Sequence, residues 1–193
     1  MTASADLSYR TAEYTRSLAA ADYIDRFRDA GRFIESCRAC PNYGCSWGCP
    51  PFDFDVEARL RRYRRLLLVA TRITPTVQAL PMELSRPLIR PERIRLERRL
   101  HELARQYDGL SCAYVGSCLY CPGGTCTRPD GKPCRHPELV RPSLEAYGFD
   151  IGRTLSELFG LELAWGRDGR MPATLTLVCG LFHNGPDDLG WSR

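Results

Sequence analysis

Two short runs of cysteine carry the residues that could do chemistry, because thiols at these spacings chelate metals. The first run, CRACPNYGCSWGCPP over residues 37–51, has the spacing C-x2-C-x4-C-x3-C. The second run, within residues 118–136, has the spacing C-x2-C-x4-C-x7-C. A C-x2-C pair brings two sulfurs to one metal, and four thiolates complete a zinc site or an iron–sulfur cluster. The eight candidate ligands are Cys37, Cys40, Cys45, Cys49, Cys118, Cys121, Cys126 and Cys134.

The redox compartment decides between metal ligands and disulfides. Residues 1–16 carry acidic and polar side chains and no apolar signal-peptide core, so we expect a cytoplasmic protein. No apolar run approaches the roughly 20 residues that a membrane-spanning helix needs. Because cytosolic thiols are kept reduced, both runs are interpreted as metal ligands and not as disulfides.

The compactness of each run favours iron–sulfur clusters over zinc. Zinc ribbons usually present two C-x2-C knuckles that are separated by a longer insert, whereas each run here is complete within a short segment. Proline follows Cys40, Cys49 and Cys121, as it follows the cysteine runs of bacterial ferredoxins. We therefore expect two iron–sulfur clusters of the 4Fe-4S type, with zinc as the alternative cofactor.

Polar residues after the second run could support its ligands. His136 lies two residues after Cys134, as a candidate ligand or as a hydrogen-bond donor behind a ligand. Arg135, Arg141 and Glu145 could bind an anion, donate to or support cluster sulfur, or form a structural ion pair. A supporting role for these residues is favoured over catalysis.

The remaining cysteines and histidines have ordinary structural interpretations. Cys112 and Cys179 fall in predicted strands, where a cysteine behaves as a small buried apolar residue. His101 lies beside Glu97 in a predicted helix, and His183 follows the last predicted strand. Both histidines are expected at the surface.

The elements that must position these residues follow from hydrophobic periodicity and from capping signals. Helices are predicted over 20–37, 56–63, 91–107 and 150–160. Strands are predicted over 65–74, over 110–116 and on either side of the turn at 167–170. The resulting order predicts an α+β domain over residues 1–193, with helices packed on one mixed sheet of ferredoxin-like character. The cysteine runs then lie in two loops, at 37–51 and 118–136.

The order of motifs resembles that of an uncharacterised family. The segments CRACPNYGCSWGCPPF, GSCLYC and GKPCRHPELVRPSLEAYGFDI together resemble a domain-of-unknown-function family of cysteine-rich predicted metal-binding proteins, from about Arg32 to Leu163. The resemblance implies metal binding and no established reaction. Cys45 and Cys126 depart from the family pattern, whereas the other six cysteines match it: Cys37, Cys40, Cys49, Cys118, Cys121 and Cys134.

The leading hypothesis is a cytoplasmic iron–sulfur protein that exchanges electrons with a redox partner protein. One alternative is an enzyme that uses a cluster with an open iron, and another is a zinc-stabilised module that binds a partner. No nucleic-acid partner is expected, because the net charge is only +4 and the basic run at 93–105 contains Glu97 and Glu102. No Gly-rich phosphate loop or serine elbow offers a competing chemistry.

Overall fold

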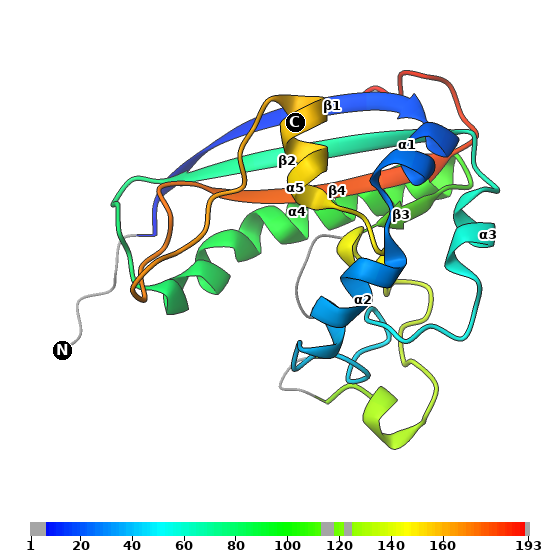
Figure 1. Ribbon diagram of the computed structural model, residues 1–193, viewed down its shortest axis with the longest axis horizontal. Coiled ribbons are helices and arrows are strands. Elements are labelled where there is room, and N and C mark those ends of the chain that lie inside the picture. The colour runs from blue at the N-terminus through cyan, green and yellow to red at the C-terminus, as the bar shows by residue number, and fades with distance from the viewer. Residues whose placement is uncertain (1–6, 113–117, 122–124, 192–193) are drawn as a thin grey trace.

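A computed structural model describes residues 7–112, 118–121 and 125–191 of the chain. Its framework is a four-stranded sheet in the order β1-β2-β4-β3, whose long strands cross the molecule side by side (Figure 1). All the described strand pairs are antiparallel. The strands are β1 (Tyr9–Ala19), β2 (Arg65–Pro75), β3 (Leu110–Cys112) and β4 (Leu175–His183).

Helices cover both faces of this sheet. The long helix α4 runs along one face, and α1 and α5 lie on the other, while α2 leads away from the sheet (Figure 1). The α-helices are α1 (Ala20–Phe27), α2 (Ala30–Arg38), α3 (Val56–Leu60), α4 (Ser85–Gln106) and α5 (Ile151–Thr154). Shorter helical turns are η1 (Met82–Leu84), η3 (Arg128–Asp130), η4 (Glu145–Tyr147) and the π-helical η5 (Leu155–Phe159).

The central strand β2 is apolar on both sides because both faces are covered. Leu66 and Leu68 belong to the core beneath α1 and α5, whereas Leu67 and Val69 belong to the core beneath α4. The sequence of a strand that is buried on both faces is a continuous apolar run, without alternation of apolar and polar residues. This explains the uninterrupted apolar stretch that predicted the strand at 65–74.

The α+β class with helices on one sheet is confirmed, and the pairing within the sheet is corrected. The described pairs are antiparallel, where a mixed sheet was expected. A helix also separates each consecutive pair of strands, unlike the β-α-β-β-α-β order of a ferredoxin-like fold. The unexpected strand is β1, which lies at the sheet edge and is largely solvent-exposed, so its sequence lacks an apolar alternation.

Several element boundaries also differ from the prediction. The helix expected over 20–37 is divided at Arg28, which bridges to Phe149, and α4 begins six residues before Pro91. The strand expected before the 167–170 turn is not formed in the described residues. Arg167 pairs with Arg170 around two turn residues with positive φ, and Arg170 also forms an isolated bridge with Pro81. Residues 113–116 of the strand expected over 110–116 lie outside the described residues.

The isolated cysteines are buried as expected, whereas one histidine is not where it was predicted. Cys112 and Cys179 are fully buried, one in each core. His183 is also fully buried, because β4 extends to this residue and pairs it with Arg65. His101 is half-buried, and burial lowers its pKa. The prediction that both histidines lie at the surface was therefore wrong for His183.

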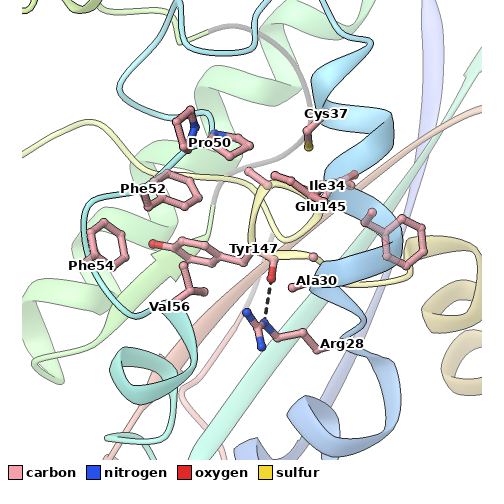
Figure 2. Close-up of a pocket in the computed structure, with 14 residues that line it drawn as sticks. Arg28, Ala30, Ile34, Cys37, Pro50, Phe52, Phe54, Val56, Glu145 and Tyr147 are labelled. Atoms are coloured by element: carbon pink, nitrogen blue, oxygen red, sulfur yellow. Dashed lines mark hydrogen bonds between the residues drawn. The ribbon is translucent and has the colours of Figure 1, made fainter.

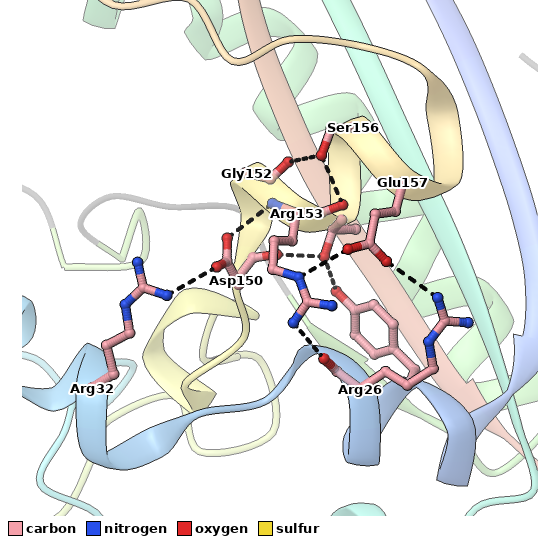
Figure 3. Close-up of polar contacts among 9 residues, drawn as sticks. Arg26, Arg32, Asp150, Gly152, Arg153, Ser156 and Glu157 are labelled. Carbon is pink, nitrogen blue, oxygen red and sulfur yellow. Dashed lines mark hydrogen bonds and ion pairs between the residues drawn. The ribbon is translucent and has the colours of Figure 1, made fainter.

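Ion pairs and hydrogen bonds fasten α5 to α1 and α2 (Figure 3). Asp150 accepts from the backbone N–H of Arg153 at 2.9 Å, which caps α5, and lies 3.6 Å from Arg32 of α2. Arg153 donates to the backbone carbonyl of Arg26 in α1 at 2.9 Å. Both Arg153 and Arg26 also pair with Glu157, at 2.9 and 3.1 Å. This network joins α5 and η5 to α1, and its exposed Arg32–Asp150 ion pair reaches α2.

None of the described helices combines the length and the apolar character that crossing a membrane requires.

Candidate metal centre

The first cysteine run begins on a helix and continues through tight turns. Cys37 lies in the last turn of α2, and the amide of Cys40 donates to its carbonyl at 3.0 Å. The amide of Gly44 then donates to the carbonyl of Pro50 at 2.9 Å. The chain is thereby folded back, which brings Cys49 toward the first two cysteines.

Three cysteines of the first run form one group. Cys37 and Cys49 are half-buried, and Cys40 is exposed. Burial raises the pKa of Cys49 to about 11, and the neighbouring thiols of Cys40 and Cys37 add to the rise. Burial and Cys40 likewise raise the pKa of Cys37. These thiols are close enough to oppose one another's ionisation, and a bound cation reverses that opposition.

Three cysteines of the second run form a comparable group. Burial raises the pKa of Cys118, and the thiols of Cys121 and Cys134 add to that rise. All of these cysteines, together with Cys126, line a cavity of about 600 Å³. Cys45 of the first run lines the same cavity. Cys45 therefore faces the second run, although its position in the sequence places it within the first.

Arg128 holds the two runs together. The short helix η3 carries its guanidinium to the first run, where Nη1 donates to the carbonyl of Ser46 at 2.6 Å and to that of Cys49, and Nη2 donates to that of Pro51. The same guanidinium lies over the ring of Trp47, 5.2 Å from its centroid. The two runs accordingly lie together at the end of the molecule away from the sheet (Figure 1). Sequence reasoning missed Arg128, since only the RPDG turn marks this position.

Hydrogen bonds among the described residues reach sulfur atoms of the second run. The backbone N–H of His136 donates to Sγ of Cys134 at 3.3 Å, and Arg135 Nη1 lies 3.7 Å from Sγ of Cys121. Arg141 instead donates to two carbonyls of its own loop, at 2.7 and 2.6 Å. The contacts thus place His136 and Arg135 against cysteine sulfur, whereas Arg141 stabilises the backbone of its own loop.

Glu145 lies beside the first run and not beside the second. It lines a cavity of about 210 Å³ together with Cys37 (Figure 2). Burial raises the pKa of the Glu145 carboxyl to about 7. Its charge also contributes to the raised pKa of Cys37. The structure therefore separates Glu145 from His136 and Arg141, with which it was grouped by sequence.

The donor set fits a metal that prefers sulfur. Thiolates are the ligands of zinc and of iron–sulfur clusters, and both groups consist of thiols, half-buried except at Cys40. Within the described ranges, no three or more Cys, His, Asp and Glu side chains are placed closely enough to hold an ion. Binding of a metal by either group would therefore require its sulfurs to come closer together than they lie in this structure.

Comparison with known proteins agrees with this donor set. The model of one family, described as Predicted metal-binding protein (DUF2284), matches residues 24–181. The match includes both cysteine groups, η3 and the cavity beside Cys37. No curated protein and no solved structure matches this chain.

Proposed function

We propose that this chain, which belongs to the DUF2284 family of predicted metal-binding proteins, is an iron–sulfur protein that transfers electrons. The observation that carries the proposal is the presence of two groups of neighbouring thiols, held together by one arginine. The first group is Cys37, Cys40 and Cys49, and the second is Cys118, Cys121 and Cys134. A bound iron–sulfur cluster would supply one-electron chemistry. Two such sites close together suit the transfer of single electrons.

The protein's own residues shape each site for this role. Hydrogen bonds to cysteine sulfur stabilise added negative charge, so His136 and Arg135 favour the reduced form at the second site. The Arg128 contacts tie the second loop to the first, which supports two sites that lie near one another. Cys40 is exposed, which would leave the first site open to a redox partner protein in the cytoplasm.

Paired ligand variants test this proposal. Cys49→Ser and Cys134→Ser are each expected to lose about half of the iron of anaerobically purified protein, because each removes a ligand from a different group. The double variant is expected to lose nearly all of it. Cys179→Ala is the matched control, since its thiol is buried in the core beneath α4. Iron content that is unchanged in both single variants would refute the two-site assignment.

A second candidate function rests on the arrangement at the first site. Only three thiols of that run are grouped, while Cys45 lines the cavity of the second run. A cluster held by three protein ligands keeps one exchangeable iron position, as an open zinc site does for catalysis. Such a site suits an enzyme that binds substrate at iron. Cys45→Ser is then expected to keep the first site, whereas Cys49→Ser loses it.

The fate of Cys45→Ser separates the two candidates. If the first site survives and its spectrum in the reduced state changes on addition of cyanide, the result favours an enzyme with an open iron position over a protein that only transfers electrons. If Cys45→Ser loses the first cluster as completely as Cys49→Ser does, Cys45 is an obligatory ligand of the first site and the plain electron-transfer function is favoured. Stoichiometric zinc in place of iron would support instead a zinc-stabilised module for partner binding.

A further inference from the structure

We infer that two copies of this chain pair through their β1 strands, which run antiparallel around a two-fold axis at Tyr14 and join the two sheets into one. The inference goes beyond the proposed function, because it concerns an assembly and rests on residues outside both cysteine runs. Its support is an unprotected edge strand, the direction of its backbone groups and the side chains that the axis brings together.

β1 is a long edge strand without the features that usually protect an edge. It has 11 residues, pairs with β2 alone and lies at the margin of the sheet (Figure 1). Its sequence, YRTAEYTRSLA, contains no proline, glycine or lysine. Its register with β2 is constant along the whole strand, so no bulge turns the edge away from a partner. An edge of this kind is a template for pairing with another strand.

The hydrogen bonds at the two ends of β1 show which backbone groups point outward. The amide of Thr76 donates to the carbonyl of Ser8, and the amide of Ala20 donates to the carbonyl of Arg64, both at 2.9 Å. Each bond joins residues that are directly opposite in the register of β1 and β2. Even-numbered residues of β1 therefore direct their N–H and C=O toward β2, and odd-numbered residues direct theirs to the free edge.

The outward groups in the middle of the strand are available to a partner. In the part of the chain that the structure describes, no hydrogen bond reaches the backbone groups of Thr11, Glu13, Thr15 and Ser17 from this side. Thr15 and Ser17 are also exposed residues. A second, antiparallel β1 meets these groups with its own, which gives about eight hydrogen bonds between the two main chains.

An axis at Tyr14 gives the register with the longest overlap. Tyr14 is the middle residue of β1, so each residue of the strand then has a partner in the second copy. Arg16 lies opposite Ala12 of the second copy, and Arg10 lies opposite Leu18. No like charges are therefore directly opposite one another in this register.

Other registers are less favourable. An axis at Glu13 places Glu13 opposite its own copy and Arg10 opposite Arg16, and like charges in these positions destabilise a strand pair. An axis at any other residue also shortens the overlap. With the axis at Tyr14, the carboxylate of Glu13 needs no partner in the second copy, because it already accepts from Trp191 of its own chain at 2.8 Å.

The pairing also accounts for the exposure of Tyr14. This side chain is 37% exposed, on the strand face opposite to that of Glu13. On the axis it lies opposite its own copy in a non-hydrogen-bonded pair, in which the Cα atoms are about 4.5 Å apart. Cross-strand aromatic pairs stabilise a sheet. A two-fold dimer uses the same edge of both copies, so no further copy can add at β1.

Sedimentation velocity of the full chain, purified anaerobically with its metal, tests the dimer. At about 100 µM the wild type is expected to sediment as a dimer. Thr15→Pro removes an outward N–H that β1 does not use within its own sheet, and is expected to weaken the dimer at least about tenfold with unchanged metal content. Thr15→Val is the matched control and is expected to dimerise as the wild type does, because it keeps this N–H.

Disulfide cross-linking with oxidised glutathione tests the register. Tyr14→Cys is expected to link to its own copy, because Cα atoms about 4.5 Å apart are within disulfide reach. Ala12→Cys, on the same exposed face, is the matched control and should not link, since its copy lies four residues along, about 14 Å away. Trypsin cleavage after Arg10 and Arg16 releases residues 11–16, which hold no native cysteine, so mass spectrometry detects only the introduced link.

Three results would overturn the inference. A monomer at about 100 µM would show that the β1 edges do not pair. A folded Thr15→Pro protein that dimerises as tightly as the wild type would show that another surface forms the dimer. Absence of the link in Tyr14→Cys, or its presence in Ala12→Cys, would place the axis elsewhere, and this result decides even if Thr15→Pro does not fold.

Discussion

Arg128→Ala is expected to release the first cysteine run from the second. The guanidinium donates two half-buried hydrogen bonds and one exposed hydrogen bond to carbonyls of the first run. At about 1 kcal/mol net for each half-buried bond, and about 0.5 kcal/mol for the contact with the Trp47 ring, the variant loses about 2–3 kcal/mol of loop docking. That loss corresponds to an increase of about 30- to 150-fold in the population of the undocked loop.

Hydrogen exchange of the loop amides measures this change directly. Peptides covering residues 40–52 are expected to exchange faster by about that factor, whereas peptides from β2 and β4 keep the wild-type rate. Arg128→Lys should give an intermediate result, because one ammonium cannot satisfy three carbonyls in the way that a planar guanidinium does. The control is Arg167→Ala, an exposed arginine in the 167–170 turn.

Two outcomes would refute the reasoning about Arg128. Acceleration of less than about threefold in residues 40–52 would mean that other contacts hold the loop. Equal acceleration in the sheet would mean that the variant lowers global stability instead of opening one loop.

Cys112→Ala and Cys179→Ala are expected to keep full metal content and to lose about 1–2 kcal/mol of stability, because each only trims a buried sulfur; loss of metal would show that a core cysteine is a ligand. Arg135→Ala is expected to lower the reduction potential of the second site in a redox titration, since it removes a donor to sulfur; an unchanged potential would contradict this. For Glu13, burial raises the pKa, but the hydrogen bond from Arg95 and further hydrogen bonds outweigh it, so the folded pKa lies below its ordinary value. The stabilisation by Glu13 is therefore present at neutral pH and lost as the pH falls through the folded pKa, and Glu13→Gln should show a smaller loss of unfolding free energy between pH 7 and acidic pH in urea titrations. An identical loss in both proteins would argue against a lowered pKa.

Local signals in the sequence predicted the elements that depend on local chemistry. Asp53 or Asp55 was the candidate cap for the helix predicted over 56–63, and Asp150 for the one predicted over 150–160. Asp55 and Asp150 each accept from a backbone N–H three residues ahead, at 3.0 and 2.9 Å. Strand β2 and most of α4 followed from apolar runs and periodicity. The start of α4 was placed too late because Pro91 was taken as its first residue, whereas the helix continues through it.

Features that depend on tertiary contacts could not be predicted in this way. β1 is an edge strand without apolar alternation, and His183 is buried by the extent of β4. Spacing placed Cys45 in the first run, yet the fold turns it toward the second. The contacts of Arg128 and the cavity between α2 and η4 join segments about 80 to 110 residues apart, for which the sequence carries no local signal.

Metal and sulfide analysis of the wild-type chain tests the central claim most directly. Protein expressed with ample iron and purified without oxygen is expected to contain iron and acid-labile sulfide in comparable amounts, approaching about eight of each per chain for two 4Fe-4S clusters. Its visible absorption should bleach on reduction with dithionite. Stoichiometric zinc without acid-labile sulfide in the same preparation would contradict the account.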